Sequence, residues 1–468
     1  MLEPAYQADV VVVGAGVAGL SAAHRLTVAG VTTMVLEAAH GVGGRMATEK
    51  VDGFRLDRVG QLLSTAYPEL RQTPGLDGLV LRPFAPGVLL HGDGRHHRAG
   101  LQPGAGGARG ALHAVRALAS APRPPSAPRP PRRPVAVPGR QVSVPRSRSG
   151  APLGTAVDQA RLGAALTRLA GTPAERLLAR PELPAGEALA ARGLPARTID
   201  GFLRPLLAAL LCDPDLTTSS RCADLALRSF ASGRLCVPEG GAEALPELLA
   251  STLPPGSVHT GVRVTSVSTT SVTTAEHGEI RCRAVLVATD ARAAAELLPG
   301  LRVPEFHPVT VVHHTTDEPP GTGASLLLDA DLGGPVAHTA VISRVDPSRA
   351  PAGRTLVSST VLGRPPGDVD TAVRMHLARL YGVSTARWET LAVRHTAEAV
   401  PAMRPPHDLR RPVRLLAGLY VCGDHRDTST VQGALHSGHR ASAAILADLG
   451  AGRSMHVADP VPTVPRAA

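Results

Sequence analysis

Residues 9–26, DVVVVGAGVAGLSAAHRL, decide the fold class of this chain. Four consecutive valines predict a buried parallel strand that ends at Gly14, and a helix is expected to follow from about Val17. Gly14, Gly16 and Gly19 have the G-x-G-x-x-G spacing. The first glycine permits a tight turn, the second lets backbone approach a diphosphate, and the third lets the helix pack closely on the strand. The motif predicts a dinucleotide-binding unit.

The residues that follow complete a βαβ unit, which we expect to run from Ala8 to Arg45. An alanine-rich helix leads to Gly30, and a second strand is expected over residues 32–36. Glu37 ends that strand about 20 residues after the glycines, where a carboxylate accepts hydrogen bonds from a ribose. Because strand, spacing and acid occur together, they favour a bound dinucleotide over the alternative, a glycine-punctuated βαβ unit without a ligand.

A second motif follows Glu37 directly, in AAHGVGGRMAT at residues 38–48. Gly43 and Gly44 give access to backbone groups, and the planar guanidinium of Arg45 can pair with a phosphate. On its own this tripeptide is equally typical of a surface loop. A site for NAD alone has no particular requirement for it, so its position beside the first motif favours FAD.

A third motif lies near the other end, in GLYVCGDHRDTSTVQGALHSGHRASAAIL at residues 418–446. A short apolar strand is expected to end at Gly423 and Asp424, and a Ser/Thr-rich turn then caps a helix from about Val431 to Leu449. In a flavin site, Asp424 accepts hydrogen bonds from ribityl or ribose hydroxyls, and the helix N-terminus faces the flavin pyrimidine. The alternative for Asp424 is an ordinary loop carboxylate.

Three stretches together resemble the flavin-containing amine oxidase superfamily, which includes protoporphyrinogen oxidases and phytoene desaturases: GAGVAGLSAAHRL (14–26), LEAAHGVGGR (36–45) and GDHRDTSTVQGALHSG (423–438). The last stretch is most similar to the desaturases. A weaker likeness covers residues 237–250 and 262–264. The resemblance implies an α/β fold, with an FAD-binding Rossmann-type domain, a parallel sheet with a βαβ N-terminus, assembled from separated segments. An α+β substrate domain is inserted between these segments.

We therefore expect two domains. The FAD-binding domain is expected in residues 1–75, 231–300 and 412–450. The substrate domain is expected in residues 76–100, 153–230 and 301–411. Within the substrate domain, residues 162–194 predict helical segments broken by prolines, and residues 198–211 predict one amphipathic helix.

The motifs and the resemblance name sixteen candidate cofactor contacts. In the family, the strand at residues 262–264 meets the adenine, which points to Val264. The family commonly has D-x-G after its G-G-R element, whereas here Asp57 is followed by glycine only three residues later. The candidates are Gly14, Gly16, Val17, Ala18, Gly19, Glu37, Ala38, Gly43, Gly44, Arg45, Gly60, Gln61, Val264, Gly423, Asp424 and Val431.

The chemistry implied by the resemblance is narrower than the family name. In amine-oxidising members, a lysine reaches the flavin through water and two aromatic rings hold the amine. The only lysine here is Lys50, and no aromatic residue follows Tyr420. We therefore expect hydride transfer from a small apolar or alicyclic substrate to non-covalent FAD, as in a desaturase or dehydrogenase. The alternatives are a non-redox flavin isomerase or mutase, and a flavin-binding protein without catalysis.

Histidines and acids outside these motifs do not assign a catalytic residue or a metal site. His425 and Asp427 are candidate acid/base groups, although a surface loop is the favoured interpretation. Exposure on one helix face is favoured over a metal pair for His436 and His439, because no third ligand is evident. We place two further pairs outside any site: His313 and His314 alternate across a strand, and His96 and His97 are expected in a loop.

The net charge of +10 comes from one segment. Between Asp93 and Asp158 the chain has eleven arginines and no acid, which leaves the rest at −1 and argues against a nucleic-acid partner. This segment, residues 101–152, is rich in Pro and Arg and is expected to be a disordered insert, unless it is coding sequence out of frame. Residues 451–468 are expected to form a loose tail.

The cysteine spacing, the apolar runs and the N-terminal sequence indicate the redox state of the cysteines and the expected compartment. Five scattered cysteines without a C-x-x-C pair predict reduced thiols in packed positions. The sequence has no apolar run of membrane-spanning length and no signal-like N-terminus, so we expect a cytoplasmic protein. A lipid-like substrate would leave peripheral membrane contact open, and the sequence does not specify an oligomeric state.

Overall fold

The computed structural model describes residues 8–100 and 152–450. The expected disordered insert and loose tail lie outside these residues, apart from Pro152. That proline is buried, and its carbonyl oxygen lies so close to Gly201 that a side chain there would overlap it. Pro152 therefore belongs to the packed body of the protein and not to a disordered insert.

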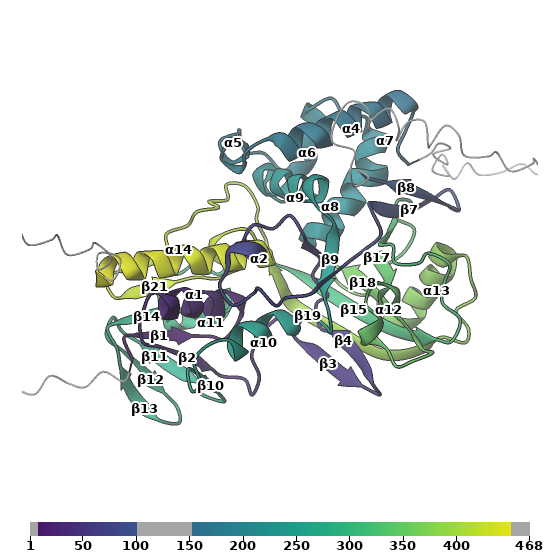
Figure 1. Cartoon of the computed structure of the whole chain (residues 1–468). Coiled ribbons are helices and arrows are strands. Elements are labelled where there is room, and N and C mark those ends of the chain that lie inside the picture. The colour runs from purple at the N-terminus through teal and green to yellow at the C-terminus, as the bar shows by residue number, and fades with distance from the viewer. Residues whose placement is uncertain (1–7, 101–151, 451–468) are drawn as a thin grey trace, which may run out of the picture.

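A six-stranded sheet is the centre of the first half of the molecule (Figure 1). Its pairs are parallel except for the last, which is antiparallel. In order across the sheet, the strands are β10 (Val258–Thr260), β2 (Thr33–Glu37), β1 (Val10–Val13), β14 (Ala284–Val287), β21 (Leu419–Val421) and β20 (Arg414–Leu416). The predicted α/β class and parallel sheet with a βαβ N-terminus are confirmed.

The valines of β1 alternate between two hydrophobic cores, one on each face of the sheet. Val10 and Val12 pack with α1 (Val17–Val28), α10 (Ala244–Ser251) and α14 (Val431–Leu449). Val11 and Val13 pack on the other face with α11 (Ala291–Leu297) and a small antiparallel sheet. That small sheet contains β11 (Val264–Val267), β12 (Ser271–Thr274) and β13 (Gly278–Arg281). Burial on both faces explains the continuous apolar run that identified the strand.

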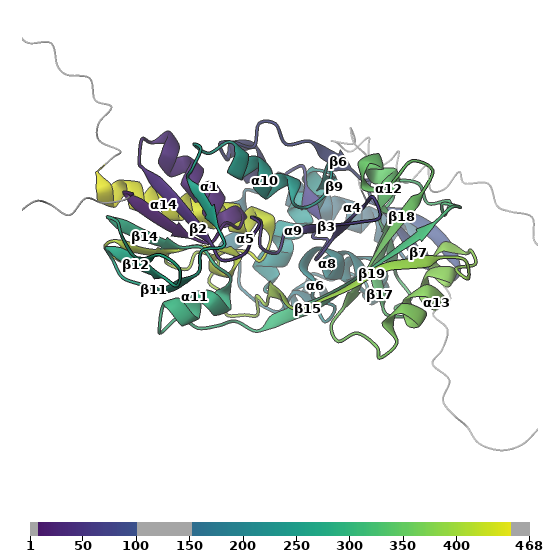
Figure 2. The same ribbon diagram turned by 90° about the horizontal axis from the view of Figure 1, so that it is seen from below.

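A seven-stranded mixed sheet forms the second half of the molecule, at the right of Figure 2. In order, its strands are β19 (Glu389–Pro401), β15 (Phe306–Thr316), β18 (Thr355–Leu362), β17 (Val336–Val341), β16 (Leu327–Asp329), β7 (Val88–Gly92) and β8 (Arg95–Ala99). Helix α13 (Val369–Tyr381) packs on it through a core with Val312 and Trp388. His96 and His97 lie within β8, so the expected loop is wrong there; His96 Nε2 lies 2.6 Å from the Leu380 carbonyl oxygen.

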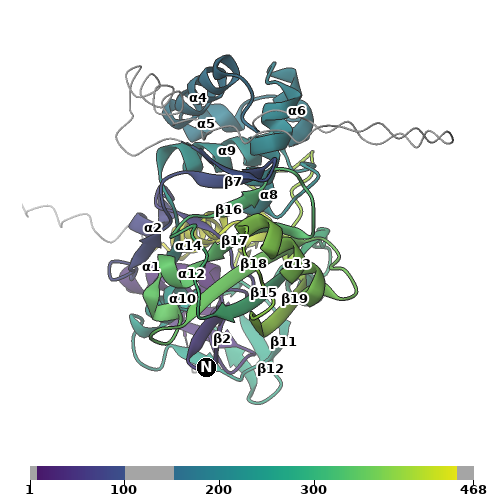
Figure 3. The ribbon, with the colours of Figure 1, turned by 90° about the vertical axis from the view of Figure 1, so that its right-hand side faces the viewer.

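A helical layer packs on the face of this sheet opposite α13, against Leu90, Leu328 and Ala340, at the top of Figure 3. Its helices are α4 (Ala156–Gly171), α5 (Ala174–Leu178), α6 (Ala185–Ala191), α7 (Ala196–Thr198), α8 (Arg204–Leu211) and α9 (Ser220–Ser232). Residues 198–211 do not form the single predicted helix, because a π-helical turn, η1 (Ile199–Leu203), precedes α8. Pro205 lies in the first turn of α8 and has no N–H to donate to the preceding turn, which accounts for the break.

Short elements connect the two halves. They are β3 (Thr48–Val51), β4 (Phe54–Asp57), β5 (Leu63–Ser64), α2 (Glu69–Gln72), β6 (Leu81–Pro83), β9 (Leu235–Pro238), α12 (Ile342–Val345), and the short 3-10 helices η2 (Pro347–Arg349) and η3 (Asp424–Arg426). All strands of the six-stranded sheet come from the three segments expected to form the FAD-binding domain; the domain boundaries themselves stay a prediction. Each of the five cysteines is a buried free thiol, as expected. None of the helices in the described ranges is long and apolar enough to cross a membrane.

Candidate functional site

A cleft of about 1010 Å³ opens at the carboxyl ends of β1, β2 and β14. Ligands of α/β proteins bind at this edge of the sheet, and the volume is at the upper end of ligand sites, about 300–1,000 Å³. Fourteen of the sixteen candidate contacts line this cleft, all except Gly19 and Gly60. The structure therefore brings residues from both ends of the chain to one place, while their contact with FAD stays a prediction.

The glycine loop leaves the start of α1 accessible from the cleft. Gly14 has φ +108° and donates its N–H to the Leu36 carbonyl oxygen at 2.7 Å. Gly16, the N-cap residue of α1, has open space where a Cβ would stand, and no side chain caps this helix. The helix N-terminus therefore presents unpaired backbone N–H groups of the kind that bind a diphosphate.

Gly19 lies behind the loop and holds the helix against the strand. A Cβ at this position would overlap the Gly14 carbonyl oxygen and lie 3.0 Å from the Ala288 Cβ. The residue thus has the packing role that the motif assigns to the third glycine, and it does not line the cleft.

Glu37 extends from the end of β2, and both of its carboxylate oxygens accept backbone hydrogen bonds. Oε2 accepts from the Ala15 N–H at 2.8 Å, and Oε1 accepts from the Ala39 N–H at 2.9 Å. Each oxygen has a second lone pair, so the carboxylate retains the capacity to accept from a ribose hydroxyl. Val264, at the start of β11, lines the same end of the cleft.

Arg45 and Asp424 join the two ends of the chain through an ion pair. Arg45 NH2 lies 2.6 Å from Asp424 Oδ1, and NH1 donates to the Ala399 carbonyl oxygen at 2.8 Å. Burial is the largest single influence on the pKa of Arg45 and lowers it, but the charge of Asp424, its hydrogen bond to Arg45 and the charge of Asp290 together raise that pKa above its usual value. The guanidinium was expected against a phosphate; in the structure its two terminal nitrogens contact protein oxygens, because β19 and the C-terminal turn pack against the G-G-R loop.

The C-terminal turn is buried, which the sequence did not predict. Gly423 has φ +136°, and Thr430 Oγ1 accepts from the Gly433 N–H at 3.1 Å, which caps α14 as expected. His425 and Asp427 were expected in a surface loop, but their residues are 6% and 9% exposed. Burial lowers the pKa of His425 to about 4. The apolar strand before the turn and α14 after it enclose these polar residues.

A second cavity, about 320 Å³ and mainly apolar, lies on the other side of this turn. Thr430 lines both this pocket and the cofactor cleft, so the two cavities meet at the start of α14. Apolar side chains of α5, α8 and α9 contribute to its wall, and Tyr67 and Phe230 contribute aromatic rings. We call it the apolar pocket. Its lining residues come from segments far apart in the chain, and among them only those of the third motif, such as Asp427 and His436, were singled out in the sequence.

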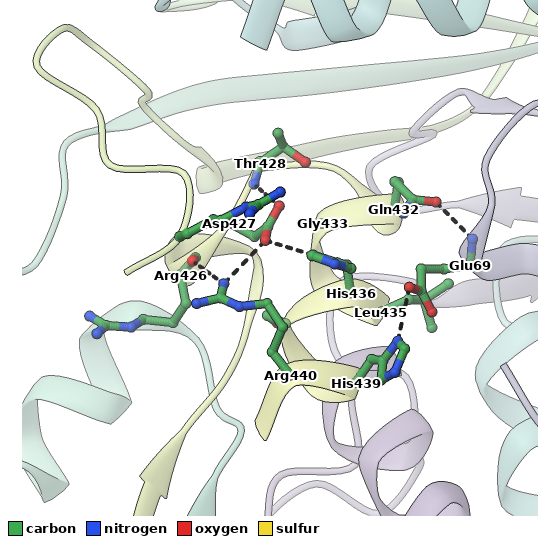
Figure 4. A network of polar contacts seen from close by, with 12 residues as sticks. Glu69, Arg426, Asp427, Thr428, Gln432, Gly433, Leu435, His436, His439 and Arg440 are labelled. Carbon is green, nitrogen blue, oxygen red and sulfur yellow. Dashed lines mark hydrogen bonds and ion pairs between the residues drawn. The ribbon is translucent and has the colours of Figure 1, made fainter. Parts of the chain in front are cut away.

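Polar side chains line the side of the apolar pocket formed by α14 (Figure 4). His436 Nδ1 lies 3.0 Å from Asp427 Oδ2, and His439 Nδ1 lies 3.3 Å from Glu69 Oε1. The side chains of His436 and His439 are 36% and 41% exposed. The two imidazoles are thus partly exposed, and each lies beside its own carboxylate.

The remaining candidates connect the two halves of the site. Gln61 Nε2 donates to the Ser429 carbonyl oxygen at 3.3 Å, whereas Gly60 lies in a turn with φ +64°, near Val311. Asp57, the acid of the altered D-x-G element, is buried and pairs with Arg349 at 2.9 Å. This ion pair gives Asp57 a structural role, while Arg58 and Gln61 of the same loop line the cleft.

The groups used by amine-oxidising members are absent from the cleft walls. No Phe, Tyr or Trp lines the cofactor cleft among the described residues. The Lys50 side chain is 66% exposed and lies 3.9 Å from Glu243 Oε1. The residues that are present fit FAD: an uncapped helix N-terminus, an acid at the end of β2 and a second helix N-terminus at Val431 all border one elongated cleft.

Comparisons with known proteins agree with this geometry. Residues 17–446 match the model of the family described as flavin containing amine oxidoreductase. Putrescine oxidase of Kocuria rosea is 53% identical over 68 residues, 14% of each chain. Hydroxysqualene dehydroxylase of Rhodopseudomonas palustris is 30% identical over 174 residues, 35% of this chain and 38% of the relative. These two alignments thus span well under two thirds of either relative.

A solved oxidoreductase from Methanosarcina mazei has a similar fold, with a TM-score of 0.65 and 16% identity. The alignment covers 92% of this chain and 99% of that structure. At this identity the likeness concerns the fold alone. The family match extends from the first turn of α1 to the last turns of α14 and so includes both ends of the cleft. The chain belongs to the flavin-containing amine oxidoreductase family, whose members are FAD-dependent oxidoreductases, and FAD is its cofactor.

Proposed function

We propose that this protein is an FAD-dependent oxidoreductase that removes a hydride from a small apolar or alicyclic substrate, as desaturases and dehydrogenases do. The observation that carries the proposal is the apolar pocket that meets the cofactor cleft at Thr430. A substrate in this pocket would lie beside the start of α14, the helix expected to face the flavin pyrimidine.

The cofactor would be held by groups that line the cleft. Backbone N–H groups at the start of α1 would bind the diphosphate, and Glu37 would accept from the adenosine ribose. Asp424 would accept from ribityl hydroxyls, while its ion pair with Arg45 keeps the carboxylate in place. When bound, FAD supplies the acceptance of a hydride.

The apolar pocket would bind and orient the substrate. Its lining by Leu210, Leu225 and Phe230 excludes water from an apolar ligand, and its volume of about 320 Å³ suits a small molecule. Polar side chains from α2, α5, α9 and α14 would contact the substrate as well. The apolar part of the wall favours a substrate with an apolar carbon skeleton.

The family name and the putrescine oxidase relative make an amine the second candidate substrate class. The exposed Lys50 counts against it. In a flavin isomerase or mutase, or in a flavin-binding protein without catalysis, the substrate would not reduce the flavin. An amine substrate and the two alternatives without net oxidation give different outcomes in one experiment.

The experiment is anaerobic reduction of the purified protein, reconstituted with FAD, followed by visible flavin absorbance. The probes are cyclohexanol, a saturated terpenoid alcohol and a saturated alicyclic hydrocarbon, compared with cyclohexylamine and putrescine. We expect at least one of the first three to bleach the flavin, with recovery on addition of dioxygen or a quinone. Bleaching by the amines alone would contradict the proposed substrate class, and no bleaching by any probe would contradict the proposed reaction.

A pair of variants tests the pocket itself. Ala226 lines the apolar pocket from α9, so Ala226→Trp would fill it and strongly raise KM while FAD content stays the same. Ser232 is exposed at the end of the same helix and does not line the pocket, so Ser232→Trp is the matched control. Equal kinetics of the two variants would place the substrate elsewhere.

A further inference from the structure

The turn between β21 and α14 fixes a carboxylate against a histidine at the edge of the apolar pocket (Figure 4). Asp427 Oδ2 accepts from His436 Nδ1 at 3.0 Å and from Arg440 NH1 at 3.3 Å. Asp427 Oδ1 accepts from the Thr428 N–H at 2.8 Å. Both oxygens of this 9% exposed residue are thus held, so the carboxylate has one orientation.

This contact determines which nitrogen of His436 carries the proton. A histidine that donates through Nδ1 to a carboxylate has an unprotonated Nε2 when it is neutral. Among the described residues, Nδ1 is the only ring nitrogen of His436 with a hydrogen-bond partner. Because His436 lines the apolar pocket, its lone pair at Nε2 is available to a ligand there.

We propose that Nε2 of His436 is the proton acceptor of the reaction and that Asp427 is its positioning residue. This inference rests on the proposed function. Conversion of a saturated carbon pair, or of a carbinol, into a double bond removes one hydride and one proton. The C–H or O–H bond that gives its proton to Nε2 leaves its electron pair behind as the new double bond. FAD takes the hydride, and an external quinone or dioxygen then takes the two electrons.

His436 suits this role better than its neighbour His439. At about 1.5 Å per helical residue, His436 lies about 9 Å along α14 from Thr430, and His439 about 13.5 Å. Each carboxylate also pairs with an arginine, Asp427 with Arg440 at 3.3 Å and Glu69 with Arg25 at 3.1 Å. The difference between the two histidines is therefore one of position, because His439 is farther from the point where the cavities meet.

The first test requires no turnover. We would treat the FAD-loaded protein with diethyl pyrocarbonate and locate modified histidines by mass spectrometry, with and without cyclohexylbenzene as an apolar probe. His436 is expected to react through its unpaired Nε2, and the probe is expected to protect it. Modification of His436 that the probe leaves unchanged would overturn its placement in the ligand-binding pocket.

The second test separates proton transfer from binding. His436→Gln is expected to slow flavin reduction by about 10²- to 10⁴-fold, the usual range for loss of a general base, with normal FAD content. The pH dependence of kcat that reports this base should also disappear. Its matched comparison, His439→Gln, is expected to raise KM and to keep kcat and its pH profile. The other charged or titratable groups that line the pocket are Asp427, His439, Glu69, Glu175, Arg228 and Arg410, and Arg440 contacts Asp427.

The outcomes distinguish this inference from the proposed function. If the unmodified protein reduces its flavin with a saturated substrate and His436→Gln is equally fast, only the inference fails. If none of the probes reduces the flavin of the unmodified protein, both the proposed function and the inference fail. Asp427→Asn adds an independent readout, because loss of the acceptor should shift the His436 tautomer seen by nitrogen NMR.

Discussion

Asp424 and Asp427 stand three residues apart in one turn, yet they line different cavities. Asp424 pairs with Arg45, from the other end of the chain, beside the polar cofactor cleft. Asp427 pairs with His436, nine residues away on α14, beside the apolar pocket. One buried turn thus divides the site into a region that holds a cofactor and a region suited to a substrate.

The two cavities are built from different parts of the protein. The cleft includes the ends of β1 and β2 and the starts of α1 and α14, which short continuous motifs supply. The apolar pocket consists of side chains from α2, α5, α8, α9 and α14, which tertiary packing alone brings together. A cofactor common to a whole family suits the first kind of site, and a substrate that differs between members suits the second.

The largest effect is expected from a substitution of Gly19, because this residue packs the helix against the strand and does not line the cleft. Gly19→Ala would force a Cβ onto the Gly14 carbonyl oxygen, at a cost of about 3 kcal/mol or more. Gly16→Ala is the matched control, because open space surrounds that position. We expect urea unfolding to show a large loss of stability for Gly19→Ala only, and FAD titration to show weaker binding for Gly16→Ala. Equal stabilities would contradict the packing role of Gly19.

The next effect concerns His425, between the two acids. Its ring nitrogens have no hydrogen-bond partner among the described residues, and burial lowers its pKa to about 4. Between that value and the unfolded pKa of about 6.5, the unfolded state binds more protons than the folded state. Folding stability therefore falls as pH falls through this window, by about 3 kcal/mol for one such histidine.

His425→Phe tests this contribution. The variant removes the titrating ring and keeps its approximate shape, so it should be at least as stable as the parent protein at pH 7. It should also lose less stability than the parent between pH 6.5 and pH 4, as measured by urea unfolding at a series of pH values. Parallel stability curves would mean that the turn opens to water and is no fixed wall between the cavities.

The cofactor half of the site could be predicted from the sequence, because each of its parts is local. The glycine spacing, the acid at the end of the second strand and the helix from Val431 to Leu449 all follow from short-range rules. The apolar pocket could not be predicted in this way. Asp427 and His436 lie in a polar stretch that is typical of a surface, whereas the structure buries Asp427 and half-buries His436.

Other differences between prediction and structure also arise from contacts that tertiary packing creates. The alternation of β8 is weak, since its five residues are Arg95, His96, His97, Arg98 and Ala99, and only pairing with β7 makes it a strand. The ion pair between Arg45 and Asp424 joins residues that are 379 positions apart. No local pattern contains such a partner. The sequence therefore predicted the cofactor but did not assign the catalytic groups.

A smaller effect is expected from exchanging the two carboxylates for amides. Asp424→Asn would remove the charge partner of Arg45 and weaken FAD binding by about 2 kcal/mol, or about 30-fold. Asp427→Asn should leave FAD affinity unchanged and slow flavin reduction instead. Fluorescence titration of the flavin-free protein and anaerobic reduction give the two readouts. Equal losses of FAD affinity in the two variants would mean that both carboxylates belong to the cofactor site.

The smallest effect is expected from Lys50→Met. In amine-oxidising relatives a lysine assists the flavin, and Lys50 is the only lysine in this chain. Its side chain is 66% exposed, lies 3.9 Å from Glu243 and does not line the cofactor cleft. An exposed ion pair of this kind contributes about 0–1 kcal/mol, so neither stability nor flavin reduction should change measurably. A large decrease in the rate of flavin reduction, measured by stopped flow, would place Lys50 at the flavin and would support an amine as substrate. An unchanged rate would leave proton transfer to groups on the other side of the turn, where His436 faces the apolar pocket.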